Sequence, residues 1–307
     1  MRKTIMIATA LVALLQACGP SQEEQQLISQ EERLKAWRED SAALKIAVMP
    51  TLDCLPLYVA EEHGMFQRLG ADVRLKPYTA QMDCDTAIAR GRVEGLVSDL
   101  VRTERLAQQG TPIIYKTATN LHWLLVTNPM ARIKQLKQLD DKMLAMTRYS
   151  ATDLLADFAV DSAKLKHERV FRIQLNDVGV RLSMLQTGTM DALLLPEPQA
   201  TQARQLKAPV LMDSRKLDLH LGVIGFSRKA LRDTARQRQV DVFIKAYNMA
   251  CDTINAQGLA RFRRLIEQRC GMKPGSVDSL PADIRFEHAQ APRQKDIDRA
   301  KAWLQKK

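Results

Sequence analysis

Residues 185–198 read Leu-Gln-Thr-Gly-Thr-Met-Asp-Ala-Leu-Leu-Leu-Pro-Glu-Pro. Gly188 predicts the end of a helix, because glycine adopts the left-handed backbone conformation without steric cost. The apolar run after it predicts a buried strand, which the two prolines end. Residues 86–95 repeat this design with a helix, Gly91, a two-residue turn and an apolar strand. The repetition predicts two similar halves built from helices and strands.

Short apolar runs alternate with helical patterns on both sides of these two units. Strands are predicted at residues 45–49, 73–75, 95–98, 112–116, 121–127, 143–147, 170–175, 191–195, 210–212 and 221–226. Helices are predicted at residues 55–63, 83–90, from 99 onward, 150–165 and 177–186. This alternation predicts an α/β fold of two lobes, each with a parallel-rich sheet flanked by helices.

The N-terminal residues carry a targeting pattern. Arg2 and Lys3 precede an apolar run, residues 5–15, which is too short to span a bilayer, and Leu15-Gln-Ala-Cys18 ends it. This arrangement resembles a bacterial lipoprotein signal peptide, here residues 1–17. The resemblance implies cleavage before Cys18, lipid on its thiol and amino group, and a mature protein anchored to a membrane outside the cytoplasm. The alternative is an ordinary secretory signal with an incidental cysteine.

Residues 18–43 come after the signal as the lipid anchor and a polar tether. They are rich in Gln, Glu and Ser, so they bury too little surface to fold alone, and we expect a spacer with a short helix at 31–39. No later run is apolar for long enough to cross a membrane. The 46 Lys and Arg residues exceed the 35 Asp and Glu residues, but they are scattered without aromatic interleaving. We therefore expect solvated helix faces and no nucleic-acid partner.

Four cysteines remain after Cys18, an even number that suits disulfides in an oxidising compartment. Three pairings are possible, of which we favour Cys54 with Cys84 and Cys251 with Cys270. Four buried free thiols are the alternative. No Cys-x-x-Cys or His-Glu-x-x-His spacing occurs in the sequence. We therefore expect no metal site, no cofactor and no catalytic residue.

The residues between the tether and the central units carry a family pattern. The stretches Lys45-Ile-Ala-Val, Leu57-Tyr-Val-Ala-Glu-Glu-His-Gly-Met-Phe66 and Ala71-Asp-Val-Arg-Leu occur there. With residues 185–198, they resemble the type-two periplasmic substrate-binding proteins of sulfonate, taurine, nitrate and thiamine-precursor ABC importers, over about residues 44–257. The sequence departs from that family at Val93-Glu-Gly95, where an Asp-Ala pair is usual, and in a less polar first loop.

The resemblance implies the lobe boundaries and the function. Lobe one comprises residues 44–120 and 225–307, lobe two comprises 128–220, and strands 121–127 and 221–226 cross between them as the hinge. A monomeric, extracytoplasmic lipoprotein of this kind captures a small solute between its lobes and delivers it to an ABC permease. A ligand sensor without import is the alternative. An enzyme is less expected, because the related fungal pyrimidine synthases carry a cysteine-dense iron motif that this chain lacks.

Polar side chains at strand ends and helix starts are the candidate ligand contacts, since ligands bind beyond the carboxyl ends of parallel strands. They are Thr51, Asp53, Cys54, Asp83, Cys84, Asp99, Trp123, Tyr149, Ser150, Thr152, Asp153, Asn176 and Glu197. The acidic excess favours a cationic or neutral heteroaromatic ligand, stacked on Trp123 or Tyr149. Each residue also has a structural alternative: Asp53, Asp83 and Ser150 as helix caps, Trp123 as core and Glu197 as a turn residue.

Overall fold

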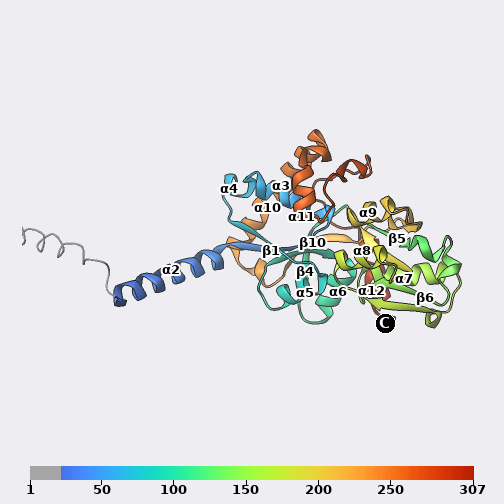
Figure 1. The fold of residues 1–307 in the computed structure, drawn as a ribbon. Helices are drawn as coiled ribbons and strands as arrows, with labels where there is room; N and C mark the ends of the chain where they lie inside the picture. Colours follow the sequence, from blue (N-terminus) through green and yellow to red (C-terminus); the bar gives the residue numbers. More distant parts are fainter. Residues whose placement is uncertain (1–21) are drawn as a thin grey trace, which may run out of the picture. The chain divides into compact units, whose positions relative to one another are not determined.

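The computed structural model describes residues 22–307, which divide into a unit ending at Ala43 and a body of residues 44–307. The predicted signal peptide and the predicted lipid-anchor residue Cys18 lie outside the described residues. Helix α2 (Gln22–Ala42) makes up the described part of the first unit (Figure 1). It is longer than the expected 31–39, because Glu, Gln, Lys and Arg, which dominate this stretch, are good helix formers. In the described part of the chain, no helix combines the length and apolar character that a membrane crossing requires.

The body contains two five-stranded sheets. The first has the order β2-β1-β3-β10-β4, and its strands are β1 (Leu44–Val48), β2 (Val73–Pro77), β3 (Gly95–Asp99), β4 (Ile113–Ala118) and β10 (Gly222–Ser227). The second has the order β7-β6-β8-β5-β9, and its strands are β5 (Trp123–Thr127), β6 (Lys142–Met146), β7 (Val170–Gln174), β8 (Ala192–Pro196) and β9 (Val210–Asp213).

The two sheets share one design, which confirms the predicted α/β fold with two lobes. Three parallel strands stand on one side of each sheet, and the fourth strand, β10 or β5, runs antiparallel to its neighbours. Strands β3 and β8 therefore occupy equivalent positions. Each comes after a glycine with a left-handed backbone, Gly91 at φ 68° and Gly188 at φ 73°, as the sequence predicts.

Helices cover the faces of both sheets. The helices of the body are α3 (Leu55–Glu62), α4 (Met65–Arg68), α5 (Gln81–Ala89), α6 (Leu100–Gln108), α7 (Ala151–Ser162), α8 (Val178–Gln186), α9 (Gln199–Gln205), α10 (Thr234–Gln257), α11 (Arg263–Arg269) and α12 (Gln294–Leu304). Figure 1 shows α3, α4 and α10 on one side of the first sheet and α5 and α6 on the other.

The crossings between the lobes differ from the expected hinge strands. Strand β5 lies wholly in the second sheet and β10 wholly in the first, because each pairs with antiparallel neighbours on both sides. The chain therefore passes between the sheets through residues 119–122 and 214–221. The chain packs closely around Gly222, at the end of the second crossing, because a Cβ atom at this position would lie 2.3 Å from Thr119 Oγ1 in the first crossing.

The C-terminal helix corrects the expectation that all residues after 225 belong to lobe one. Helix α12 packs against α6 of the first lobe (Figure 1), yet Ala300 and Leu304 share a core cluster with Leu154 of α7 in the second lobe. The indole Nε1 of Trp303 donates to Asp157 Oδ2 on α7 at 2.7 Å. An amphipathic last helix therefore ties the two lobes together.

The predicted disulfides are wrong, because Cys54, Cys84, Cys251 and Cys270 are all free and buried. The sulfur of Cys84 lies 3.6 Å from Met49 Sδ, and that of Cys54 accepts the Met49 backbone N–H at 3.4 Å. Burial raises the pKa of all four thiols, that of Cys251 to about 12. These cysteines act as small apolar core residues.

Candidate ligand-binding cleft

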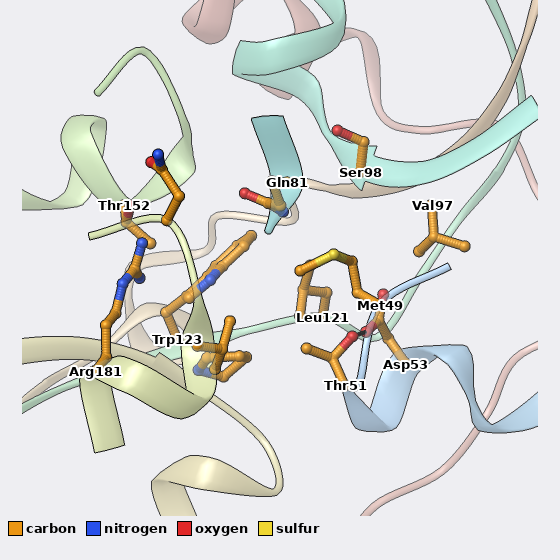
Figure 2. Close-up of a pocket in the computed structure, with 13 residues that line it drawn as sticks. Met49, Thr51, Asp53, Gln81, Val97, Ser98, Leu121, Trp123, Thr152 and Arg181 are labelled. Atoms are coloured by element: carbon orange, nitrogen blue, oxygen red, sulfur yellow. Dashed lines mark hydrogen bonds between the residues drawn. The ribbon is translucent and has the colours of Figure 1, made fainter. Parts of the chain in front are cut away.

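A cavity lies between the two sheets, beyond the carboxyl ends of their parallel strands. Its walls come from both lobes and consist of Met49, Thr51, Asp53, Gln81, Val97, Ser98, Leu121, Trp123, Thr152, Asn176, Val178, Arg181 and Pro196 (Figure 2). The cavity measures about 20 Å³, which is room for about one water molecule. The lobes therefore close tightly on each other in this structure.

Asp53 supplies the buried charge of the first-lobe wall. Its carboxylate accepts the Thr51 hydroxyl at 2.6 Å and the Thr119 hydroxyl at 3.2 Å, and the residue is 2% exposed. Burial raises the pKa of Asp53, which the two hydroxyl hydrogen bonds partly oppose. Among residues 22–307 no Lys or Arg side chain forms an ion pair with it. Asp53 is therefore a hydrogen-bond acceptor that a donor or cation in the cavity would stabilise.

Trp123 supplies the aromatic surface. Trp123 begins β5, directly after the first crossing. Its backbone N–H donates to the hydroxyl oxygen of Ser214, a residue of the second crossing, at 2.9 Å. Figure 2 shows its indole between Arg181 on one side and Met49 on the other. The ring is 4% exposed. Because both crossings position this residue, movement of the hinge also moves the aromatic wall.

Arg181 brings a buried positive charge to the second-lobe wall, and three of its five N–H donors are engaged within that lobe. Its Nε donates to Leu175 O at 2.7 Å, its Nη1 donates to Leu194 O at 2.9 Å, and its Nη2 donates to the Thr147 hydroxyl. Burial lowers the pKa of Arg181 to about 10. The guanidinium therefore connects the ends of β6 and β7 with β8, which leaves at most two of its N–H donors for a ligand.

Neutral polar groups complete the wall. Thr152 Oγ1 accepts the Thr147 backbone N–H at 2.9 Å, and Asn176 Nδ2 donates to Met82 Sδ across the cleft at 3.0 Å. The hydroxyl of Ser98 is buried and has no hydrogen-bond partner among the described residues. The Ser98 hydroxyl is therefore available for a ligand, and Gln81 adds an amide to the same wall.

Hydrogen bonds between the lobes hold the cleft shut. Ala80 and Asp177 form an antiparallel β-bridge at the α5 side. The Leu52 N–H donates to Glu197 O at 2.8 Å, and the Ala151 N–H donates to Asp99 Oδ1 at 3.0 Å. A ligand larger than a water molecule requires these contacts to separate.

Comparison with protein families identifies the chain. The family model described as NMT1/THI5 like matches residues 51–257. The chain belongs to the NMT1/THI5-like family. The match spans most of both lobes and contains most of the residues that line the cavity. A comparison with curated proteins found no match.

Solved structures share the fold of this NMT1/THI5-like chain. The alkanesulfonate-binding protein SsuA from Xanthomonas axonopodis pv. citri, bound to MOPS, has a TM-score of 0.73 at 18% identity, over 86% of this chain and 91% of that one. The nitrate-binding protein NrtA from Synechocystis has 0.65 at 13%, over 83% and 74%. PhnD1 from Prochlorococcus marinus, with methylphosphonate, has 0.59 at 13%, over 86% and 99%. Their likeness supports the type-two periplasmic binding protein fold.

The structure brings five of the predicted contacts to the cavity of this NMT1/THI5-like protein, namely Thr51, Asp53, Trp123, Thr152 and Asn176. Of the other first-lobe candidates, Cys54 and Cys84 are buried in the core, and Asp83 is exposed in the first turn of α5. Asp99 is buried beside the cavity at the start of α6.

The remaining second-lobe candidates have structural partners. Ser150 caps α7 through its hydroxyl, which accepts the Thr152 N–H. The Asp153 carboxylate, in the first turn of α7, accepts the Tyr149 N–H at 2.9 Å. Arg105 of the first lobe lies over one face of the Tyr149 ring at 4.0 Å, so that face is not open to a stacked ligand. Glu197 turns toward α9.

The sequence reasoning missed the other wall residues. Gln81 lies at a helix start and Ser98 at a strand end, the kind of position that identified Thr51. The same local signal therefore predicts both residues. Arg181 lies within α8, and apolar residues such as Val178 and Leu121 have no polar signal at all. These residues reach the cavity only through the tertiary arrangement of the helices.

Proposed function

We propose that this chain is an extracytoplasmic solute-binding lipoprotein, anchored through Cys18, that captures a small organic solute and delivers it to an ABC permease. The observation that carries the proposal is the cleft itself, whose walls come from two similar lobes joined by two short crossings. Separation of the lobes admits the solute and closure buries it, so the permease meets two distinguishable shapes. The lipoprotein signal and the family membership support this function.

The wall chemistry favours a cationic or neutral heteroaromatic solute. Trp123 presents an aromatic surface, and Asp53 accepts hydrogen bonds without a cationic partner among the described residues. Arg181 engages three of its five N–H donors with backbone and hydroxyl acceptors. An anion such as those named for the structural neighbours would meet the buried Asp53 carboxylate, and the guanidinium of Arg181, the positive charge in the same wall, is largely engaged by neutral acceptors. A ring that bears N–H groups satisfies both features.

Binding is supported over catalysis by the state of the candidate nucleophiles. The four thiols of the body are buried with raised pKa values, so they are thiols and not reactive thiolates at neutral pH. Asp53 and Trp123 recognise a solute without a covalent step.

A thermal-shift screen of the full chain against amines, pyrimidines, sulfonates and amino acids tests the proposal. A solute that binds the folded state raises the unfolding midpoint, and we expect an amine or a pyrimidine to do so. Asp53→Asn then weakens affinity for that solute by about 10-fold to 100-fold, the effect of one charge-assisted hydrogen bond.

Asp83→Asn is the matched control, because Asp83 is an exposed aspartate outside the cavity. It leaves the affinity unchanged. A screen in which only sulfonates raise the midpoint overturns the proposed ligand class, and a screen in which no class does so overturns solute capture.

A further inference from the structure

Asp99 stands where two helices begin, one from each lobe. Its side chain is fully buried. The carboxylate oxygen Oδ1 accepts the Arg102 backbone N–H at 3.0 Å, which caps α6 of the first lobe. The same oxygen accepts the Ala151 N–H at 3.0 Å, in the first turn of α7 of the second lobe. One atom therefore makes one bond within its lobe and one bond across the cleft.

The second oxygen of the Asp99 carboxylate, Oδ2, accepts no hydrogen bond from the described residues. Asp99 Oδ2 is also buried. A proton placed on Oδ2 therefore breaks no existing hydrogen bond. It leaves both bonds at Oδ1 in place and removes a negative charge from a site without water access.

The charged neighbours of Asp99 are partly engaged elsewhere. The Arg102 guanidinium pairs with Asp85 on α5, while its Nε and Nη1 have no partner in the described part of the chain. On β4, Tyr115 donates its hydroxyl to Glu104 at 2.7 Å. From the second lobe, the nearest acid of α7, Asp153, pairs with Arg172 at 3.2 Å. Arg105 of α6 covers one face of Tyr149, and Arg181 of α8 donates three hydrogen bonds to neutral acceptors of its own lobe.

We propose that Asp99 is a closure latch whose shared carboxylate couples closing of the cleft to uptake of a proton. The inference rests on the proposed solute-binding function, because it treats the movement of the lobes as capture. It adds a regulatory variable, the pH outside the cytoplasm, which the cleft walls alone do not supply.

The direction of the effect follows from linkage. Burial raises the pKa of Asp99 to about 6 in this closed structure, although the Arg102 charge and the two backbone N–H groups lower it. Separation of α6 from α7 removes the Ala151 N–H and admits water, so the pKa returns toward the ordinary carboxyl value of ~4. The closed state then binds more protons than the open state, so a falling pH favours closure.

The size of the effect follows from the same two pKa values. At pH 7 the carboxylate is ionised in both states, and at pH 5 it is mostly protonated in the closed state alone. The closing equilibrium therefore shifts by about tenfold between pH 7 and pH 5. A solute that binds only the closed form gains affinity by at most this factor, and by the full factor only where the open form predominates without solute.

Residue-resolved hydrogen exchange of the full chain tests the latch without a ligand. The Ala151 amide is protected only when the cleft is closed, whereas the Arg102 amide is capped within one lobe and serves as an internal control. After correction for intrinsic exchange, we expect Ala151 protection to rise about tenfold from pH 7 to pH 5, with Arg102 protection unchanged. Asp99→Asn keeps both acceptor bonds and carries no charge, so Ala151 protection becomes high and independent of pH.

The wild-type titration needs no variant, so the latch remains testable if Asp99→Asn does not fold. Ala151 protection that does not change between pH 7 and pH 5, or a pH dependence that persists in Asp99→Asn, overturns the latch. Asp83→Asn is the charge-matched control and retains the wild-type response. A pH-dependent Ala151 amide together with an empty ligand screen would remove the proposed function and leave the latch.

Discussion

Asp99 and Glu197 occupy equivalent places in the two lobes but have different roles. Each acid lies at the end of the third parallel strand of its sheet, β3 or β8, beyond a glycine-ended helix and a short turn. Asp99 reaches across to the other lobe through Ala151. The Glu197 carboxylate stays in its own lobe, where Oε2 accepts the Thr201 N–H at 2.9 Å and Oε1 accepts Arg204 Nη2 at 2.7 Å, and the backbone carbonyl of Glu197, not the carboxylate, bonds across to Leu52.

The carboxylate of Asp99 reaches the other lobe and that of Glu197 stays in its own because of the residues that follow each strand. Helix α6 begins directly after Asp99, so the short side chain caps that helix and still reaches the first turn of α7 in the other lobe. Pro198 separates Glu197 from α9, and the longer side chain turns back toward the first turn of that helix. A strand end therefore brings an acid near the cleft, but the start of the next helix determines whether its carboxylate faces the other lobe.

The largest expected effect comes from removal of the Glu197 carboxylate. Glu197→Ala leaves the Thr201 N–H uncapped and Arg204 unpaired beside a buried site, so we expect the free energy of unfolding to fall by about 2 kcal/mol. Arg204 is 31% exposed, which keeps the loss below that of a fully buried pair. Urea unfolding measures this change.

Glu197→Gln is the matched control, since its amide oxygen still accepts the Thr201 N–H and about half of the loss is recovered. Ligand affinity stays unchanged in both variants. A Glu197→Ala protein of wild-type stability that has lost its ligand would show that Glu197 faces the cleft after all.

A smaller effect, with a defined pH dependence, is expected at Asp99. Its pKa of about 6 in the folded protein lies above the unfolded value of ~4, so the folded state binds more protons. This group therefore adds stability as the pH falls, by about 1 kcal/mol between pH 7 and pH 5.

Unfolding midpoints of wild type and Asp99→Asn at the two pH values isolate this contribution from that of other buried acids, such as Asp53 and Asp85, whose pKa values are also raised. The difference between the proteins shrinks from pH 7 to pH 5. A difference that grows on acidification would mean that the ionised carboxylate stabilises the fold.

Much of the fold could be predicted because its signals are local. Gly91 and Gly188 mark helix ends by their backbone freedom, and Ser150 marks a helix start by its hydroxyl. Apolar runs mark strands regardless of their partners. The sequence could not show in which sheet β5 and β10 lie, because the same apolar run suits a crossing strand and a strand within one sheet, and only pairing distinguishes them.

The site could be predicted only where a local signal coincided with the cleft. Thr51 and Trp123 lie just after or at the start of strands at the correct edge, so strand position was enough. Arg181 comes from inside a helix, and its buried charge depends on three acceptors that are distant in sequence. The cysteine pairs were wrong because an even number of cysteines contains no geometric information.

The smallest expected effect compares the two glycines that end α5 and α8. Both have a positive φ, so Gly91→Ala and Gly188→Ala should each lower the free energy of unfolding by about 1 kcal/mol. A Cβ at position 91 meets nothing within 4 Å, whereas one at position 188 lies 2.5 Å from Met130 Cε.

Met130 is 70% exposed, and its methyl group ends a flexible side chain. The side chain can therefore move, and the excess cost at position 188 is a few tenths of a kcal/mol. Met130→Ala in the Gly188→Ala background should remove that excess and make the two lobes equivalent at this turn, as urea unfolding of the four proteins would show. An excess that persists without the Met130 side chain would mean that the backbone around Gly188 is more constrained than the backbone around Gly91. The two lobes would then differ in these turns as well as in the roles of Asp99 and Glu197.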